Sequence, residues 1–214
     1  METFKLGTPA LICRWRIAEK SLPLENRHLR ALAARTVNDE PVAQALVAWA
    51  KQHVEWTLED GAREHPNGVL MLTIDKEGRA IMTVGGYRPL KRVLAYDLLA
   101  RAQSSWREAE RTGVSPEDLW AVRGDALVWC TSPDYRPSGA SSLVSDLART
   151  LGMPVLHDEE LIAEFGDDGI EADEVFLVSD EHGVVPAKDC SGMRTQKFME
   201  SYQKLLESQG TRTR

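Results

Sequence analysis

Two loops of this sequence carry the residue types that bind small anions. The first, Ser179–Gly183 (SDEHG), lies between the apolar runs Val175–Val178 and Val184–Val185, which predicts a β-hairpin with a polar turn. The second, Arg136–Ser141 (RPSGAS), leads into a predicted helix. Backbone N–H groups and hydroxyls in such turns and at helix N-termini bind anions. The alternative interpretations are a plain surface hairpin and an ordinary helix N-cap.

Other motifs with a known chemistry are missing from the sequence. It contains no GxGxxG, GxxxxGK[ST], HExxH or GxSxG pattern. The histidines do not have the spacing of metal ligands, so we expect no metal site. They are His28, His53, His65, His157 and His182.

Composition narrows the classes of partner. The chain has 214 residues and a formal net charge of -7, which disfavours nucleic acid and anionic membranes as partners because both need a basic face. Cys13, Cys130 and Cys190 are odd in number and include no CxxC pair, which favours a reducing cytoplasm over a disulfide framework. No apolar run approaches the length of about 20 residues that spans a bilayer. We therefore expect a cytoplasmic protein that binds a small molecule.

Hydrophobic periodicity predicts the elements that position the two loops. Strands are expected at 11–17, 69–74, 80–84, 119–122, 126–130, 154–156, 175–178 and 184–186. Helices are expected at 25–35, from 39–41 onward, and at 92–111, 142–151, 158–164 and 195–206. Hairpin signals occur in both halves, which predicts a mixed α/β (α+β) fold rather than a purely parallel sheet. The break at 85–89 predicts a small domain of residues 1–88 and a larger one of residues 89–214.

The order of these segments is similar to that of a known family. A Gly and hydroxyl loop enters a helix that ends in Leu-Gly-Met-Pro-Val, and an acidic segment, EADEVFL, a polar loop and GVVP follow. The run from Leu147 to Pro186 resembles the C-terminal half of the class IV aminotransferases. These are pyridoxal phosphate (PLP) enzymes that include branched-chain and D-amino-acid aminotransferases and aminodeoxychorismate lyase. Met1–Phe4 resembles the ETF opening of that family, and Leu22–Leu32 resembles its HLxRL segment.

The resemblance implies a two-domain fold, usually a homodimer, with PLP between the domains. The lysine that holds the cofactor falls at about Ala95, and Lys91, four residues earlier, is the candidate catalytic residue in its place. The phosphate-binding arginine falls on Ala31, with Arg30 beside it, and the phosphate-binding hydroxyl of the EVFL loop falls on Asp180. The implied cofactor-binding residues are Arg30, Gly139, Ala140, Ser141, Ser179 and Asp180.

Two functions follow from the resemblance and its departures. The first is a PLP-dependent aminotransferase or aminodeoxychorismate-lyase-like enzyme acting on a small amino or carboxylic acid. The second is a homologue without PLP that binds another small ligand between the domains or acts as a partner subunit. Asp180 favours the second, because a carboxylate beside a phosphate dianion is repulsive by several kcal/mol at ~4 Å in a site of effective dielectric about 20.

Overall fold

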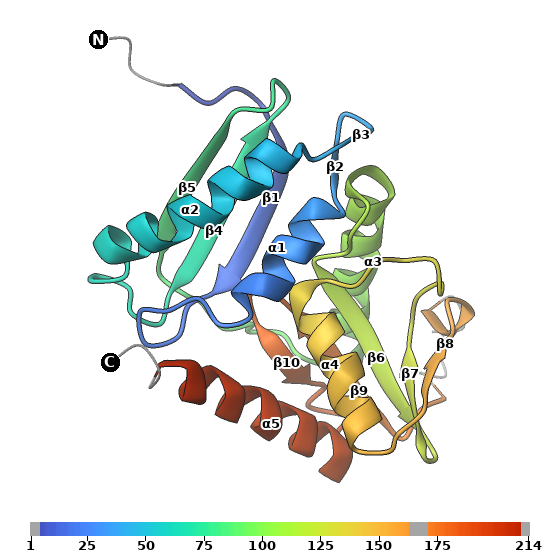
Figure 1. Ribbon diagram of the computed structural model, residues 1–214. Helices are drawn as coiled ribbons and strands as arrows, with labels where there is room; N and C mark the ends of the chain where they lie inside the picture. Colours follow the sequence, from blue (N-terminus) through green and yellow to red (C-terminus); the bar gives the residue numbers. More distant parts are fainter. Residues whose placement is uncertain (1–4, 163–170, 211–214) are drawn as a thin grey trace.

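The computed structural model describes residues 5–162 and 171–210 of the chain. Its N-terminal part is a three-stranded antiparallel sheet of order β1-β4-β5, with a long helix against it (Figure 1). The strands are β1 (Pro9–Arg16), β4 (Val69–Asp75) and β5 (Ala80–Gly85), and the helix is α2 (Gln44–Gly61). Leu11, Cys13 and Trp15 alternate along β1 and are all buried, as a strand with one face in the core requires.

The start of α2 differs from the prediction. Asp39-Glu40-Pro41 does not begin the helix, because Glu40–Pro41 forms the short strand β3 and pairs with β2 (Thr36–Val37). Asn38 and Asp39 between them both have positive φ, 53° and 65°. Two such residues form the tight turn that joins antiparallel strands, so the chain turns back before the helix starts at Gln44.

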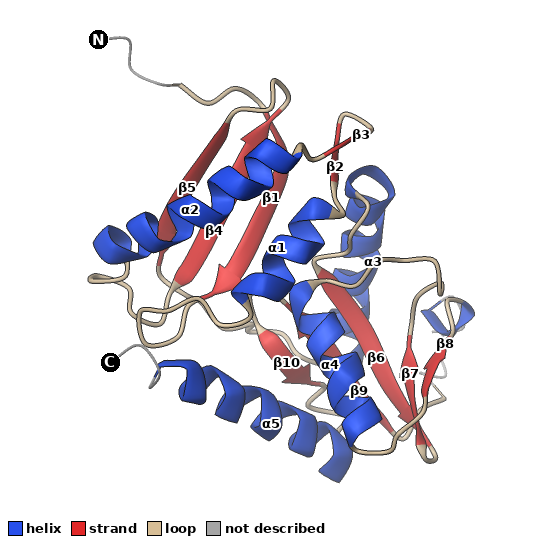
Figure 2. Cartoon of the chain, viewed as in Figure 1, coloured by secondary structure: helices blue, strands red, loops and turns tan. Residues whose placement is uncertain are grey.

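The C-terminal part is a five-stranded sheet of order β10-β9-β6-β7-β8 (Figure 2). Among the strands that the structure describes in this sheet, β7 and β8 are the one parallel pair, and they are connected through α4. The strands are β6 (Glu117–Arg123), β7 (Ala126–Trp129), β8 (Val155–His157), β9 (Glu174–Ser179) and β10 (Gly183–Pro186). The antiparallel pairs confirm the predicted mixed α/β fold.

Helices cover both faces of this sheet. They are α3 (Ala95–Thr112), α4 (Gly139–Thr150) and α5 (Met193–Gly210). Leu119 and Leu177 pack toward α3, whereas their neighbours Trp120 and Phe176 pack toward α4 and α5. The four positions follow the period of two that separates the faces of a strand. Both faces are buried, which is why β9 appears in the sequence as an uninterrupted apolar run.

Other helix boundaries also differ from the prediction. The helix predicted at 92–111 begins at Ala95, and Gly113 ends it in the left-handed region with φ 79°, as expected of a C-cap. The helix predicted at 158–164 is a 3-10 turn at Glu160–Ile162, and its last two residues lie outside the described part of the chain. The proposed boundary between residues 88 and 89 stays a prediction. One apolar cluster contains only residues between 11 and 84, but α1 (Glu25–Ala33) of the same half packs on α4.

Candidate functional site

The first turn of α4 is closed by two oxygen acceptors from the chain itself. Ser138 is the N-cap, and its Oγ accepts the N–H of Ser141 at 3.1 Å. Asp180, in the turn between β9 and β10, accepts the N–H of Ala140 on its Oδ1 at 2.7 Å. A carboxylate at this position also interacts favourably with the positive end of the helix dipole. The two loops that the sequence predicted as anion sites therefore meet, and one of them supplies the anion.

Asp180 also faces a histidine from the N-terminal half. Its Oδ2 lies 3.5 Å from Nδ1 of His28 on α1, and the side chains are 5% and 2% exposed. Burial alone would raise the pKa of Asp180, but the neighbouring His28 and the N–H of Ala140 hold it below its ordinary value. The carboxylate is therefore an anion, and it joins α1 and α4 through a buried contact.

Two neighbours of the His28 ring hold it in position for this contact. The ring of His28 stacks on Trp15 of β1, with centroids 5.3 Å apart. It also lies directly against Gly139, where an added Cβ would collide with the imidazole. Glycine at position 139 is thus required by a close approach between helices and not by an unusual backbone angle.

A second buried carboxylate lies under the same turn. Ser141 Oγ donates to Asp118 Oδ2, and Asp118 is 2% exposed on β6. Burial raises the pKa of Asp118 to about 7, against the lowering effect of the hydrogen bond from Ser141. The hydroxyl of Ser141, implied as a phosphate ligand by the resemblance, is therefore engaged inside the protein.

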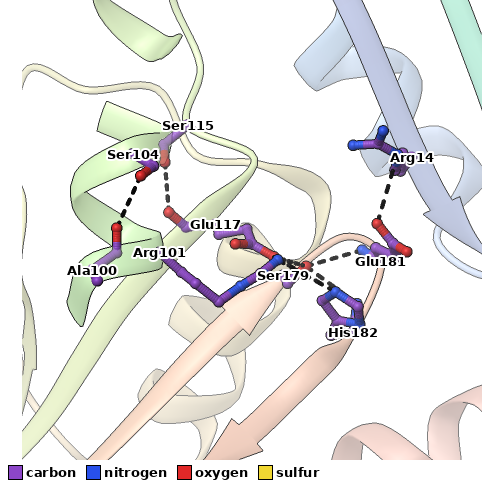
Figure 3. Close-up of polar contacts among 9 residues, drawn as sticks. All are labelled: Arg14, Ala100, Arg101, Ser104, Ser115, Glu117, Ser179, Glu181 and His182. Atoms are coloured by element: carbon purple, nitrogen blue, oxygen red, sulfur yellow. Dashed lines mark hydrogen bonds and ion pairs between the residues drawn. The ribbon is translucent and has the colours of Figure 1, made fainter. Parts of the chain in front are cut away.

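Ser179 begins a polar cluster on the other side of the β9–β10 turn (Figure 3). Its Oγ donates to Glu117 at 3.2 Å and accepts the N–H groups of Glu181 and His182 at 3.2 and 3.1 Å. Arg101 on α3 binds the same Glu117 oxygen at 2.7 Å. A cavity of about 120 Å³ lies beside this cluster, between β1 and α3, with Arg14 and Glu181 among its lining residues. These two side chains are 3.8 Å apart.

A larger cavity of about 500 Å³ lies beside the same turn, and His182 lines it together with Arg16, Tyr87 and Tyr202. Arg16 stacks on Tyr87, with its guanidinium carbon 3.3 Å from the ring centroid. Two buried nitrogens on its lining side chains, Arg16 Nη1 and His182 Nδ1, have no hydrogen-bond partner among the described residues. Such groups are costly unless a ligand or solvent meets them.

The proton on His182 can be placed from its neighbours. Burial lowers the pKa of His182 to about 4, so the ring is neutral at pH 7. Its Nε2 lies 3.5 Å from Arg101 Nη2, and because a guanidinium can only donate, Nε2 is the acceptor. Nδ1 therefore carries the hydrogen, and it has no acceptor among the described residues.

The structure brings together five of the seven residues named from the sequence. They are Gly139, Ala140, Ser141, Ser179 and Asp180. Arg30 lies apart from them, exposed on α1, and its Nε bonds Asn26 O within the helix. Sequence reasoning missed His28. From the resemblance, Glu117 and Asp118 could be considered only in place of the glutamate that pairs with the pyridine nitrogen of PLP, not as residues buried beside the β9–β10 turn and α4. The available signals were the histidine of the HLxRL-like segment and two carboxylates at the start of a predicted strand.

Lys91 also lies apart from the cluster, and it is exposed. Two residues on, Val93 O accepts the N–H of Lys188, and Ala95 N donates to Asp189. Lys188 follows the end of β10 and Asp180 precedes its start. At about 3.3 Å per residue these two points are separated by roughly the length of the strand, ~13 Å.

Comparison with solved structures identifies the architecture. A hypothetical aminotransferase from Mycobacterium tuberculosis, in its PLP-bound form, aligns with a TM-score of 0.64 over 97% of this chain and 95% of that one. The chain has the fold of the class IV aminotransferases. Branched-chain amino acid aminotransferase of Escherichia coli aligns with a TM-score of 0.56 over 92% of this chain and 86% of that one. A proposed 4-amino-4-deoxychorismate lyase from Legionella pneumophila aligns with a TM-score of 0.59 over 97% and 96%.

This chain shares its fold with these three proteins but very little of its sequence. Identities to these three proteins are 13%, 12% and 11%, in the order given. No protein-family model and no curated protein sequence matches the chain. Among the described residues no cluster of side chains could hold a metal ion, and no helix is long and apolar enough to cross a membrane.

The residues of this aminotransferase-like site do not fit PLP. The cofactor needs a lysine amine for its aldehyde and free donors for its phosphate. All eight lysines of the chain are exposed: Lys5, Lys20, Lys51, Lys76, Lys91, Lys188, Lys197 and Lys204. The Ala140 N–H and the Ser141 hydroxyl, which the resemblance assigns to phosphate, are bound to Asp180 and Asp118.

Proposed function

We propose that this chain works without PLP and binds a small carboxylic acid in the cavity beside the β9–β10 turn. The observation that supports this proposal best is the position of Asp180. The resemblance places a phosphate-binding hydroxyl there. The Asp180 carboxylate instead accepts the N–H of Ala140, a residue that the resemblance assigns to the phosphate, and it faces His28. An internal anion in the phosphate position excludes a second one by charge repulsion and by occupying the donors.

The carboxylate class is inferred from two unpartnered donors on residues that line the cavity. Arg16 Nη1 and His182 Nδ1 each need an acceptor, and a carboxylate supplies two oxygens that accept without donating. The walls include Ile17, Val184 and Met199, which suit the hydrocarbon part of an organic acid. The homodimer implied by the resemblance is part of the same proposal and can be measured by light scattering.

Calorimetric titration with benzoate and succinate tests the proposal. The wild type is expected to bind at least one of them, and Arg16→Gln to weaken that binding roughly tenfold, the value of a charge-assisted hydrogen bond. Arg88→Gln is the matched control, because Arg88 is exposed in the segment between β5 and α3. Binding that Arg16→Gln leaves unchanged would overturn the proposed ligand class.

A second candidate is the PLP enzyme, which the PLP-bound form of the Mycobacterium tuberculosis structure favours. It requires Lys91 to hold the cofactor and act in proton transfer. The purified protein would then be yellow, with an absorption band that borohydride and Lys91→Ala both abolish. We expect a colourless protein and no new absorption band when millimolar PLP is added. A stoichiometric adduct of PLP with a lysine would contradict the first proposal.

A further inference from the structure

β5 is an edge strand that lacks the features which usually protect such an edge. It pairs with β4 on one side, and nothing within the described residues pairs with its other side. Natural edge strands commonly carry charged side chains or proline, and the sequence of β5, AIMTVG, contains neither. β1, at the opposite edge of the same sheet, carries Arg14 and Arg16. The free side of β5 is therefore open to another strand.

The hydrogen-bonding groups on that free side can be assigned from the hairpin that β5 forms with β4. Asp75 N donates to Arg79 O at the turn, and hydrogen-bonded pairs alternate with non-bonded pairs along an antiparallel ladder. Ile81 and Thr83 therefore bond β4. It follows that the N–H and C=O groups on the free side are those of Ala80, Met82 and Val84.

An aromatic stripe on α2 is also left uncovered. Trp49, His53 and Trp56 recur every three or four residues, so they form one flank of the helix. The ring centroids of Trp49 and His53 are 4.2 Å apart, and those of His53 and Trp56 are 5.1 Å apart. Trp56 is 63% exposed. The stripe is therefore a fixed apolar surface of large rings that meets solvent.

The position of α1 shows which way the aromatic stripe faces. α1 lies at the β1 side of the sheet, where the His28 ring stacks on Trp15 (Figure 1). The flank of α2 that faces α1 lines a groove between the two helices through Gln44, Val47, Ala48 and Lys51. The aromatic stripe is the opposite flank, so it faces the β5 side of the sheet. The end of α2 touches β5 itself, because a Cβ at Gly61 would collide with Val84.

We propose that β5 pairs with β5 of a second copy of this chain about a two-fold axis, which joins the two three-stranded sheets into one. The free N–H and C=O groups select an extended backbone as the occupant, because only a strand can continue the ladder. A two-fold axis brings identical side chains together, so a strand that pairs with its copy must be free of repelling charge. β5 meets this condition, whereas β1 does not.

Both faces of the joined sheet contribute to this interface. On the helix side, the two aromatic stripes lie on either side of the axis and add area to the strand pair. A stable interface buries about 1,200–2,000 Å² in total, and a tryptophan contributes up to about 250 Å². On the other side, Ile81 and Thr83 supply β-branched side chains for cross-strand pairs, and Ile81 is 38% exposed.

This inference rests on the homodimer included in the proposed function and names its contact surface. It does not rest on the carboxylate ligand, because no residue that lines the two cavities at the β9–β10 turn lies on β5 or on the aromatic stripe. Arg16→Gln is therefore expected to leave the assembly unchanged. A dimer that lacks the β5 contact would overturn the inference and leave both the homodimer and the ligand standing.

Light scattering of the full chain at micromolar concentration is the first test. The wild type is expected to be a dimer, and Trp56→Glu to raise its dissociation constant roughly thirtyfold, as loss of a central anchor and like charges across the axis require. Ile81→Lys, which installs a natural edge guard, should act in the same direction. Both positions are exposed, and melting temperatures will show that the variants fold. Ala48→Glu, exposed on the opposite flank of α2, is the matched control.

Hydrogen exchange is the second test, because it locates the contact. The three amides on the free side of β5 should be protected in the wild-type dimer and exchange faster in Trp56→Glu. The amides of Ile81 and Thr83, which bond β4, should stay protected in both and serve as the internal reference. A monomeric wild type would overturn the inference. A dimer whose three free-side amides exchange rapidly would do the same, as would equal loss of dimer in the Ala48→Glu control.

Discussion

Asp180 accepts the backbone N–H of Ala140 at 2.7 Å, so the turn of a hairpin closes the first turn of a helix that belongs to a distant part of the sequence. Its other oxygen faces His28 from the N-terminal half. One buried carboxylate therefore holds three segments together, α1, α4 and the β9–β10 turn.

Asp180→Asn should destabilise the protein by about 1.5–3 kcal/mol, because it removes the charge from a buried carboxylate that accepts the Ala140 N–H at the start of α4. The folded pKa of Asp180 is below its ordinary value, so its contribution is present at neutral pH and is lost as the pH falls through the folded pKa. Urea denaturation at pH 7 measures the loss. Asp134→Asn, at an exposed position, is the control, and a change equal to that of the control would contradict the ionic role.

Gly139→Ala should cost about 1–3 kcal/mol, because the added Cβ would collide with the His28 ring in a packed interior. Gly85→Ala is a matched control, since nothing lies within 4 Å of a Cβ at that position. Both free energies of unfolding can be measured by urea denaturation. Equal effects of the two substitutions would show that the approach of His28 to α4 is looser than described.

Asp118→Asn should remove a pH dependence of stability. The folded pKa of Asp118 is about 7 and its ordinary value is 3.8, so the wild type loses stability through this group as the pH rises from about 4 to 7. The asparagine keeps an acceptor for Ser141 and does not ionise. The free energy of unfolding of the variant, relative to the wild type, should rise by up to about 4 kcal/mol between pH 4 and pH 8. A difference that does not change with pH would refute the raised pKa.

The cysteines should differ in reactivity. Cys13 is 2% exposed, with its pKa raised to about 11 by burial, and Cys130 is fully buried. Only Cys190 is partly exposed. A thiol reagent should therefore modify one cysteine in the native protein and three in urea, and Cys190→Ser should abolish the native reaction. Fast modification of Cys13 would mean that the cavity it lines is open to the reagent.

The elements were predictable where local pattern determines them. The run Val175–Val178 and the turn before Gly183 are confirmed as β9, a turn and β10. Gly183 has φ 71°, a backbone angle that favours glycine at the end of such a turn. The start of α2 was predicted wrongly, because Asn38 and Asp39 adopt positive φ and form a hairpin that their flanking residues do not signal.

The site was predictable only in part. The resemblance placed Asp180 with Gly139–Ser141, and the structure brings them together. It did not reveal that Asp180 binds the helix, or that His28 is its partner, because that contact joins segments far apart in the sequence. The burial of Asp118 was equally hidden, since a polar residue at the start of a strand is usually exposed.

Asp180 makes the contact between α1 and α4 independent of the concentration of any dissolved ligand. The stabilisation that a dissolved ligand gives a protein grows with the logarithm of the ligand concentration, whereas a side chain is present at one equivalent per chain under every condition. Dialysis cannot remove the Asp180 carboxylate, because it is covalently part of the chain. The junction between α1 and α4 is therefore complete as soon as the chain has folded, independently of any cofactor in the surroundings.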